Sequence, residues 1–362
     1  MKCLLDNIIF SLQKSGGASV VWYELISRLL SDHDCDLHFI EYCNANQNIF
    51  RRRLNIPCGL LTVSNDSLLK VARYINVRSK YKERHIFHSS HYRIDTNPSA
   101  FNITTVHDFV YEYYMHGLQR TVHSCQKWGA IKHSDAIICV SESTRSDMCK
   151  FIRNLDESKI FVVYNGVDPA FHVIDHAAFS LNIPFETEEY ILYIGSRRVP
   201  YKNFDVALRV CAQLKMPLIM VGGEELSSDE KKKIELYLEH NKYVLYRGLS
   251  QPLLNELYCR AFALLYPSLY EGFGIPVLEA QRSGCPVIAC KRSSIPEVMG
   301  ESDYCLNDAN ASAFCEAVQY LKNHYGERDK EKKRGRNNSL LFSWDSAYEK
   351  IISIYKQVLN NV

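Results

Sequence analysis

Short apolar runs alternate with longer amphipathic stretches along almost the whole chain. The short runs have the length and the β-branched composition of strands, and the longer stretches have the length and periodicity of helices. Such alternation is typical of parallel sheets, because each parallel strand is reached through a crossover connection that is usually a helix. The sequence therefore predicts an α/β fold with strands at residues 2–6, 36–41, 85–89, 102–106, 136–141, 160–164, 190–195, 217–222, 243–247, 262–266, 286–289 and 303–305.

The periodicity lapses once, from about residue 165 to residue 188, and then restarts. A chain of 362 residues exceeds the size at which a single core stops growing, so we place a linker there. We predict two similar doubly wound domains, residues 1–168 and 169–343, that face each other across a cleft. Ligands of such sheets bind at the carboxyl ends of the strands, so the cleft is the expected site. The predicted helices are residues 18–31, 66–82, 118–133, 142–153, 203–214, 229–240, 251–260, 276–283, 310–324 and 344–360, and the charged run 327–334 is expected to be a solvated helix or loop.

The composition argues against several classes of protein. A net charge of only +2 disfavours a general nucleic-acid binder, and no apolar run approaches the ~18 residues of a membrane span. Asp6 comes too soon after the N-terminus for a secretory signal. The thirteen cysteines include no C-x-x-C pair, and Cys139, Cys211 and Cys290 lie in apolar runs. This pattern favours buried reduced thiols over disulfides or a zinc site, and we expect a cytoplasmic protein.

The segment Glu271-Gly-Phe-Gly-Ile-Pro-Val-Leu-Glu279 carries the most specific chemical signal in the chain. Its two glycines let the backbone approach a ligand closely, and Pro276 suits the first turn of a helix. The N-terminus of that helix can receive phosphate through its free N–H groups. Carboxylates at both ends can accept hydrogen bonds from the hydroxyls of a sugar or ribose. The segment therefore predicts a site for a phosphorylated, hydroxyl-rich ligand such as a nucleotide sugar.

A basic loop follows the first strand of the second half. Gly195 and Ser196 end this strand, and Arg197, Arg198 and Lys202 precede the next helix. Arginine binds phosphate in bidentate fashion and lysine supplies a compact charge, so the loop can hold a diphosphate. The spacing to Lys202 favours Arg197 over Arg198. The alternative is a basic loop that only solvates the start of a helix.

Two motifs in the first half end at the expected ligand edge. Gly16 and Gly17 precede a predicted helix, where paired glycines suit close approach to phosphate, although the motif is neither G-x-G-x-x-G nor a P-loop. A plain loop is an equal alternative. His107 follows a predicted strand and can donate to a substrate hydroxyl while Asp108 orients its ring. A structural histidine that caps a loop is the alternative there.

Three further segments have competing interpretations. Residues 70–93 hold seven Lys or Arg against one acid, which suits either a solvated helix face or contact with anionic lipid or a lipid-linked acceptor. Residues 32–36 contain D-x-D patterns that can chelate a divalent cation, but they precede a strand, so we expect a polar turn. Gly222 and Gly223 follow a predicted strand without the third glycine of a dinucleotide-binding loop.

Taken together, these segments resemble the retaining glycosyltransferases of family 4, which have the GT-B fold of two Rossmann-like domains. The most specific part of the resemblance is EGFGIPVLEA with an upstream Arg and Lys. The loop with Tyr201-Lys202-Asn203 is similar to that of enzymes that build O-antigen or capsular polysaccharide, many of which use GDP-mannose. The matching segments are residues 16–17, 107–108, 140–147, 162–168, 195–204, 271–280 and 342–355.

The resemblance implies a role for each matching residue. Glu279 would hold the ribose hydroxyls, and Glu271 would face the transferred sugar. Arg197 and Lys202 would neutralise the departing diphosphate, and His107 would bond the sugar near its C6 hydroxyl. The last helix would cross back onto the first domain. The implied catalytic residues are His107, Arg197, Lys202 and Glu271, and the implied donor-binding residues are Gly16, Gly17, Gly195, Ser196, Gly272, Phe273, Gly274, Ile275 and Glu279.

The resemblance also implies a reaction. A retaining hexosyltransferase would transfer a hexose, mannose first, from a nucleotide sugar to a saccharide or lipid-linked glycan in polysaccharide or O-antigen synthesis. GDP-mannose is the first donor expected and a UDP-hexose the second, with no cofactor or metal, because cations and amides can stabilise the diphosphate. Peripheral contact with the inner face of the plasma membrane would use residues 70–93. A sugar-nucleotide epimerase and a non-catalytic binding subunit are the alternatives, whereas a glycoside hydrolase has no use for the cations around Lys202.

Overall fold

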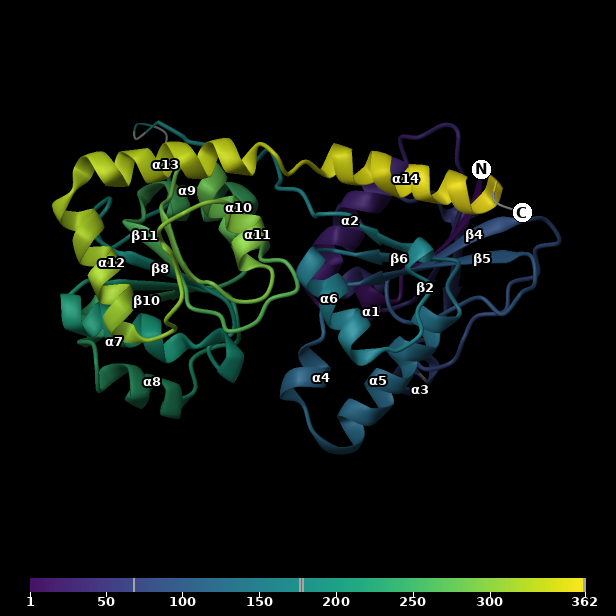
Figure 1. Cartoon of the computed structure of the whole chain (residues 1–362), viewed down its shortest axis with the longest axis horizontal. Coiled ribbons are helices and arrows are strands. Elements are labelled where there is room, and N and C mark those ends of the chain that lie inside the picture. Colours follow the sequence, from purple (N-terminus) through teal and green to yellow (C-terminus); the bar gives the residue numbers. More distant parts are fainter. Residues whose placement is uncertain (68, 176, 178, 361–362) are drawn as a thin grey trace. The chain divides into compact units, whose positions relative to one another are not determined.

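The computed structural model describes residues 1–67, 69–175, 177 and 179–360. The chain divides into two compact units, Met1–Gly166 with Trp344–Val362, and Val167–Ser343. Each unit is built on its own sheet (Figure 1). The closing helix α14 (Trp344–Asn360) begins at the residue that the sequence predicts, and it belongs to the unit of the N-terminal residues. We call this the first unit and the other the second unit.

The first unit contains a seven-stranded sheet in which every pairing is parallel. Its strand order is β3-β2-β1-β4-β5-β6-β7, so the chain reverses direction across the sheet between β1 and β4. The strands are β1 (Lys2–Asp6), β2 (Asp36–Tyr42), β3 (Leu61–Ser64), β4 (His85–Ser89), β5 (Ala100–Val106), β6 (Ala136–Cys139) and β7 (Ile160–Val162). The helices besides α14 are α1 (Ile9–Leu12), α2 (Gly17–Leu29), α3 (Leu69–Ala72), α4 (Val110–Tyr114), α5 (Gly117–Lys132) and α6 (Glu142–Phe151).

The second unit contains a six-stranded parallel sheet of order β10-β9-β8-β11-β12-β13. Here the chain reverses between β8 and β11, and such a reversal opens the crevice in which doubly wound sheets bind their ligands. The strands are β8 (Ile191–Ile194), β9 (Leu218–Val221), β10 (Tyr243–Tyr246), β11 (Ala263–Tyr266), β12 (Val287–Cys290) and β13 (Cys305–Leu306). The helices are α7 (Phe204–Leu214), α8 (Ser228–Glu235), α9 (Gln251–Arg260), α10 (Ile275–Arg282), α11 (Ile295–Met299), α12 (Ala311–Asn323) and α13 (Tyr325–Ser339).

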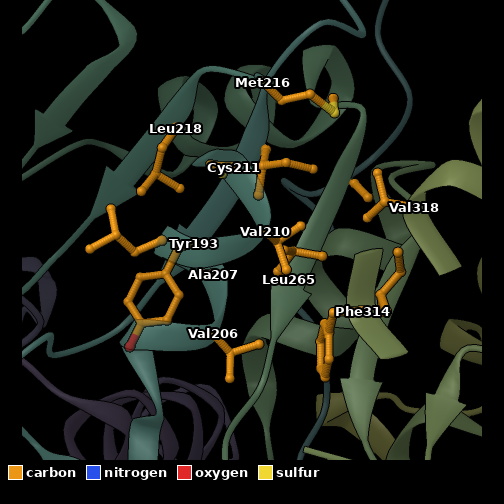
Figure 2. Packing of buried hydrophobic residues seen from close by; sticks show 14 of the residues in the cluster. Tyr193, Val206, Ala207, Val210, Cys211, Met216, Leu218, Leu265, Phe314 and Val318 are labelled. Carbon is orange, nitrogen blue, oxygen red and sulfur yellow. The ribbon is translucent and has the colours of Figure 1, made fainter. Parts of the chain in front are cut away.

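The core of the second unit explains why its first strand reads as a continuous apolar run. Ile191, Leu192 and Tyr193 on β8 are all buried, because helices cover both faces of a parallel sheet. The apolar face of α7, which includes Val206 and Val210, packs on this sheet (Figure 2). The ring of Tyr193 lies in this core while its hydroxyl reaches the loop that follows the strand. The core therefore holds that loop directly.

The sequence-based assignment is wrong in the segment 66–82. Only Leu69–Ala72 is helical there, and residue 68 lies outside the described part of the chain. Val77 instead pairs with Asp95 in a β-bridge, and the amide of Ser79 donates to the Asp95 carboxylate. These hydrogen bonds to a distant segment compete with the helix and replace it. The sequence-based assignment also omitted α1, β3, α4 and α11.

Two other expectations concern burial. Cys139, Cys211 and Cys290 are completely buried, as their apolar surroundings predict, and all thirteen cysteines are free thiols. The charged run 327–334 lies in α13, which confirms a helix, but Arg328 and Glu331 are buried rather than solvated.

Candidate functional site

The loop after β8 is held in a fixed shape by the core below it. The hydroxyl of Tyr193 donates to the carbonyl of Ser196 at 3.1 Å and approaches that of Lys202 at 3.4 Å. The loop ends in a 3-10 turn, Pro200–Lys202, and the amide of Leu269 donates to the carbonyl of Tyr201 at 2.7 Å. Residue 269 follows β11, so the two loops at the reversal point of the sheet are joined.

Lys202 and Glu271 form an ion pair at this junction. The ammonium of Lys202 lies 2.6 and 2.7 Å from the two carboxylate oxygens, and the side chains are 18% and 11% exposed. Burial, together with the negative charge of Glu271, raises the pKa of the Tyr266 hydroxyl at the end of β11. Residues 69 positions apart in sequence therefore meet. Because an ammonium can donate several hydrogen bonds, Lys202 can stay bound to Glu271 and also bind an anion.

The turn after Glu271 positions the start of α10. Gly274 has φ of 109° and precedes the first helical residue, Ile275. A Cβ atom at residue 274 would lie 2.8 Å from Cδ1 of Ile295, and a side chain would also be strained at this φ. Pro276 occupies the first turn, as the sequence predicts. The helix N-terminus, with its partial positive charge, therefore begins at Ile275, shortly after Glu271 in the chain.

Two serines that the sequence interpretation missed hold this turn from behind. The amide of Glu271 donates to Oγ of Ser293 at 2.8 Å. The fully buried hydroxyl of Ser294 lies 2.7 Å from the carbonyl of Phe273 and 3.0 Å from that of Glu271. Ser293 adopts a left-handed conformation with φ of 45° to reach its position. The available signal was the sequence Ser293-Ser294-Ile-Pro after a strand, which repeats the Ile-Pro helix start of α10.

Glu279 lies on α10 next to the fully buried Tyr258 of α9, whose hydroxyl donates to its carboxylate at 2.8 Å. Removal from water raises the pKa of Glu279 to about 7, with a smaller contribution from the negative charge of Asp168. The group can therefore change its charge near neutral pH. Its proton would be displaced most easily when hydroxyl donors surround the carboxylate.

Arg197 has different partners from those expected of a diphosphate ligand. Its guanidinium donates to the carbonyls of Gly222, at 2.8 Å, and Glu224, and pairs with Glu230 at 3.3 Å. The side chain is only 2% exposed, and a Cβ on Gly223 would lie 3.1 Å from its Nη1. The absence of a side chain at Gly223 thus makes room for this arginine. Arg198 is 44% exposed and pairs with Glu224 and Glu230.

In the first unit, the glycine motif begins a helix at the expected edge. Gly16 caps α2, and Ser19 in its first turn accepts hydrogen bonds from Gln13 at 2.7 Å and Asn48 at 2.8 Å. A Cβ on Gly17 would meet no atom within 4 Å, so the space in front of it is open. The helix N-terminus is accordingly held from one side and unobstructed at Gly17.

His107 directly follows β5. Burial lowers its pKa to about 4, and the charge of Lys127 adds to this shift while that of Asp108 opposes it. His107 lines a small cavity with Trp22, His88 and Tyr348. The cavity volume of about 30 Å³ suits one or two water molecules and not a sugar ring. His107 is therefore a neutral side chain at neutral pH, with its ring at the edge where the strands end.

The acidic turn before β2 is occupied by protein contacts. Asp32 accepts hydrogen bonds from the hydroxyl of Tyr348 at 2.5 Å and from the amide of Asp34 at 2.9 Å. In the part of the chain that the structure describes, no group of three or more His, Cys, Asp or Glu side chains is arranged to hold a metal ion. No helix among the same residues has the length and apolar character needed to cross a bilayer.

Comparison with known families identifies the chain. Residues 15–171 match the model of Glycosyltransferase Family 4, and residues 177–338 match that of Glycosyl transferases group 1. The two matches together span most of the chain, which belongs to the glycosyltransferases that these models describe. The resemblance inferred from its motifs is thus confirmed, and the matched residues include both glycine motifs, His107, Lys202, Glu271 and Glu279.

Curated relatives of this glycosyltransferase include several mannosyltransferases. It is 30% identical to O-antigen chain mannosyltransferase B of Escherichia coli over 174 residues, which is 46% of this chain and 45% of the relative. It is 26% identical to O-antigen chain mannosyltransferase RfbU of Salmonella typhimurium over 68% of each chain. The alignments thus span from about half to two thirds of these relatives.

Solved structures establish the fold of this glycosyltransferase. Sucrose-phosphate synthase from Thermosynechococcus elongatus superposes with a TM-score of 0.75 at 16% identity, covering 100% of both chains. Anabaena HepE, in a complex with UDP and glucose, gives 0.72 at 14% identity and covers 98% of both. With the two parallel sheets described above, this similarity identifies the GT-B fold.

Proposed function

We propose that this glycosyltransferase transfers a mannosyl group from GDP-mannose to a saccharide or lipid-linked glycan, with retention of configuration, in O-antigen polysaccharide synthesis. The observation that carries the proposal is the Lys202–Glu271 pair beside the N-terminus of α10, with Glu279 on the same helix. These groups supply a cation and the positive end of a helix dipole for a diphosphate, and carboxylates for hydroxyls. A nucleotide sugar carries both a diphosphate and sugar hydroxyls, so it can use all of these groups at once.

In the proposed mechanism, the enzyme accelerates the reaction mainly by stabilising the leaving group. Negative charge grows on the diphosphate as the glycosidic bond breaks, and Lys202 and the α10 N-terminus are already in position to stabilise it. Glu271 faces the sugar, and neutral His107 of the first unit is suited to donate to a substrate hydroxyl. The acceptor hydroxyl attacks on the face that the leaving group quits, and a phosphate oxygen takes its proton. The reaction then needs neither an enzymic nucleophile nor a metal, and full activity in EDTA is expected.

The choice of mannose rests on the names of the relatives. Two of them are O-antigen chain mannosyltransferases, and a third is the serotype-specific mannosyltransferase WbdA of Escherichia coli. A fourth is an MMP alpha-(1->4)-mannosyltransferase of Mycolicibacterium hassiacum at 29% identity over 48% of this chain. The structure of HepE with UDP and glucose makes a UDP-hexose the second candidate. A panel of sugar nucleotides therefore separates the two donors most directly.

The first experiment is a thermal unfolding screen against GDP-mannose, UDP-glucose and related sugar nucleotides. A ligand that binds only the native state raises the unfolding temperature, so GDP-mannose should give the largest rise. Donor turnover is then measured with and without a glycan acceptor. Release of GDP that depends on acceptor supports transfer. Conversion of the donor without acceptor would identify an epimerase, and binding without any turnover would identify a non-catalytic subunit.

We further propose that the first unit contacts an anionic membrane surface. Five large apolar side chains are exposed on α3, on the residues after it, and on α5. The helices α3 and α5 lie side by side in Figure 1. The side-chain amide of Gln126 on α5 donates to the carbonyl of Arg73 at 2.5 Å, which ties the two segments together. We call these five residues with the neighbouring cations the apolar–basic patch: Val71, Tyr74, Ile75, Leu118 and Val122, with Lys70, Arg78 and Arg120.

Anionic lipid is the proposed partner, because Lys70, Arg78 and Arg120 are exposed on the same segments as the apolar side chains. Binding to vesicles of phosphatidylglycerol and phosphatidylcholine should exceed binding to pure phosphatidylcholine. The double variant Ile75→Asp, Leu118→Asp should weaken it about tenfold, since each side chain loses apolar contact. Leu236→Asp, at an 82% exposed site in the second unit, is the matched control. Equal binding of the double variant and the wild type would exclude this surface.

A further inference from the structure

A second hollow lies at the opposite edge of the sheet in the second unit. It has a volume of about 460 Å³ and is lined by residues that immediately precede β8, β9, β10 and β11 and by the turn between α12 and α13. All strands of this sheet run parallel, so their amino ends share one edge. The Lys202–Glu271 pair belongs to loops at the carboxyl ends. The hollow is therefore separate from the candidate donor site.

Cations predominate around this hollow. Lys215, Lys242, Lys322 and Arg328 line it against two carboxylates, Glu188 and Glu189. The side chains of all three lysines are exposed, and no carboxylate of the described residues lies within ion-pair distance of them. Arg328 and Lys332 both pair with Glu188, the latter at 2.6 Å. The charge of Glu188 is thus already offset, and the lysines leave an excess of positive charge.

Arg328 supplies the buried part of the lining. Its side chain is only 6% exposed, and its guanidinium lies 4.9 Å from the ring centroid of Phe262 and 5.7 Å from that of Tyr325. Its Nε is buried and has no hydrogen-bond partner. A buried N–H without an acceptor is costly, because it has lost its bond to water.

The backbone around the hollow is also unusual. Glu188 and Lys215 adopt left-handed conformations with φ of 65° and 53°, and both line the hollow. They are two of five non-glycine residues with positive φ in the described chain. At Lys215 this conformation ends α7, as is common at helix C-termini, whereas at Glu188 it requires support from the surrounding structure. The hollow is thus held in shape by its own backbone.

We propose that this hollow binds the phosphate group of a small phosphorylated molecule. Lysine ammonium groups are compact charges suited to phosphate oxygens, and the lining carries an excess positive charge that a phosphate dianion balances. The volume falls within the ~300–1,000 Å³ of small-molecule pockets. The proposal does not depend on the donor or the reaction, since the hollow shares no residue with the candidate donor site.

Lysine footprinting tests the proposal on the full-length protein. Acetylation by acetic anhydride is measured at each lysine by mass spectrometry, with inorganic phosphate or with chloride at equal ionic strength. Phosphate should slow acetylation of Lys215, Lys242 and Lys322 at least about threefold, because bound phosphate holds their ammonium groups. Lys231, exposed on α8 outside the hollow, is the internal control and should be unaffected. Equal rates at the three lysines with and without phosphate would overturn the proposal.

Variants give a second, independent measurement. The double variant Lys242→Met, Lys322→Met should bind inorganic phosphate about tenfold more weakly by calorimetry, whereas Lys231→Met should bind it as the wild type does. The substituted side chains are exposed, and thermal unfolding verifies that each variant is folded. Lys202→Met should leave protection of Lys215 intact, which separates this hollow from the donor site. Unchanged phosphate affinity in the double variant would refute the assignment.

Discussion

The carboxyl edges of the two sheets differ in the charge that they can present to a ligand. In the second unit the edge presents a formed ion pair, Lys202–Glu271, and a helix N-terminus. In the first unit the ion pair at this edge, Asp6–Arg93, is buried, and near it lie imidazoles that burial keeps uncharged, because the pKa of His107 falls to about 4 and that of His88 to about 3. The charged edge suits a leaving group whose charge grows during reaction, and the neutral edge suits hydroxyl groups. The following predictions test this division.

The largest effect is expected for Lys202→Met. The charge of Lys202 matters most when the diphosphate leaves, so turnover should fall about 100- to 1,000-fold while donor affinity changes much less. Single-turnover rates and donor Kd measured by calorimetry separate the two quantities. Lys231→Met, at an exposed lysine of the same unit, should retain normal turnover. Near-normal turnover of Lys202→Met would remove the charged edge from the chemistry.

A smaller loss is expected for His107→Ala. Removal of one hydrogen bond to a sugar hydroxyl should lower kcat/KM about 10- to 100-fold, and His107→Asn should recover part of it. The folded-state pKa of about 4 lies below the ordinary 6.5, so the ring is neutral throughout pH 6–8. The ratio of wild-type to His107→Asn activity should therefore be constant over this range. A step in that ratio near pH 6.5 would mean that His107 acts as a charged group.

The same residue has a consequence for stability. Because the folded-state pKa is depressed, the unfolded chain binds a proton at His107 more readily. The contribution of His107 to folding stability is therefore fully present above pH 6.5 and is lost as the pH falls toward about 4. As the pH falls from 6.5 to 4, the free energy of unfolding should therefore decrease less in His107→Gln than in the wild type. Urea titration at each pH measures both.

Local sequence signals predicted those parts of the two carboxyl edges that each lie within one continuous segment of the chain. The Gly-Phe-Gly-Ile-Pro run predicted a helix at 276–283, and α10 spans Ile275–Arg282, because a glycine turn and a first-turn proline act over neighbouring residues. The same holds for α2 after Gly16. The positions and types of most strands followed from apolar runs that are buried on both faces.

Contacts between distant segments escaped the sequence interpretation. The partners of Arg197 are Gly222, Glu224 and Glu230, which its own loop gives no means of identifying. Ser294 lies 21 residues from the carbonyl that it bonds. The helix predicted at 66–82 failed for the same reason, since Asp95 takes hydrogen bonds from that segment. A single sequence reports such pairings only through the fold that creates them.

Glu279 provides a test of charge within the second unit. Its raised pKa of about 7 means that the carboxyl is neutral below this pH and ionised above it. An ionised carboxylate accepts stronger hydrogen bonds from ribose hydroxyls, so donor affinity should rise about fivefold from pH 6 to pH 8. Glu279→Gln should give a nearly flat profile in calorimetric titrations. A nucleotide sugar has no ionisation of its own near pH 7, so a pH-dependent profile in the variant would reject this assignment.

The stability of the ligand-free protein should change in the opposite direction. Because the folded-state pKa of Glu279 exceeds its ordinary 4.5, the native state holds this proton more tightly than the unfolded chain. The stabilising contribution of the neutral carboxyl is present below pH 4.5 and is lost as the pH rises through about 7. Glu279→Gln should therefore gain stability relative to the wild type as the pH increases from 5 to 8, as measured by urea unfolding without donor.

The smallest effect is expected for Ser294→Ala, which touches the charged edge only through the backbone. Loss of the bond to the carbonyl of Phe273 should destabilise the fold by about 1 kcal/mol. It should also raise the donor KM and lower kcat by a few-fold each, because the turn between Glu271 and α10 is less firmly held. Ser312→Ala, at an exposed serine on α12, is the matched control. If Ser294→Ala lost stability but kept both kinetic constants, the charged edge would owe its geometry to Gly274 and Ser293 instead.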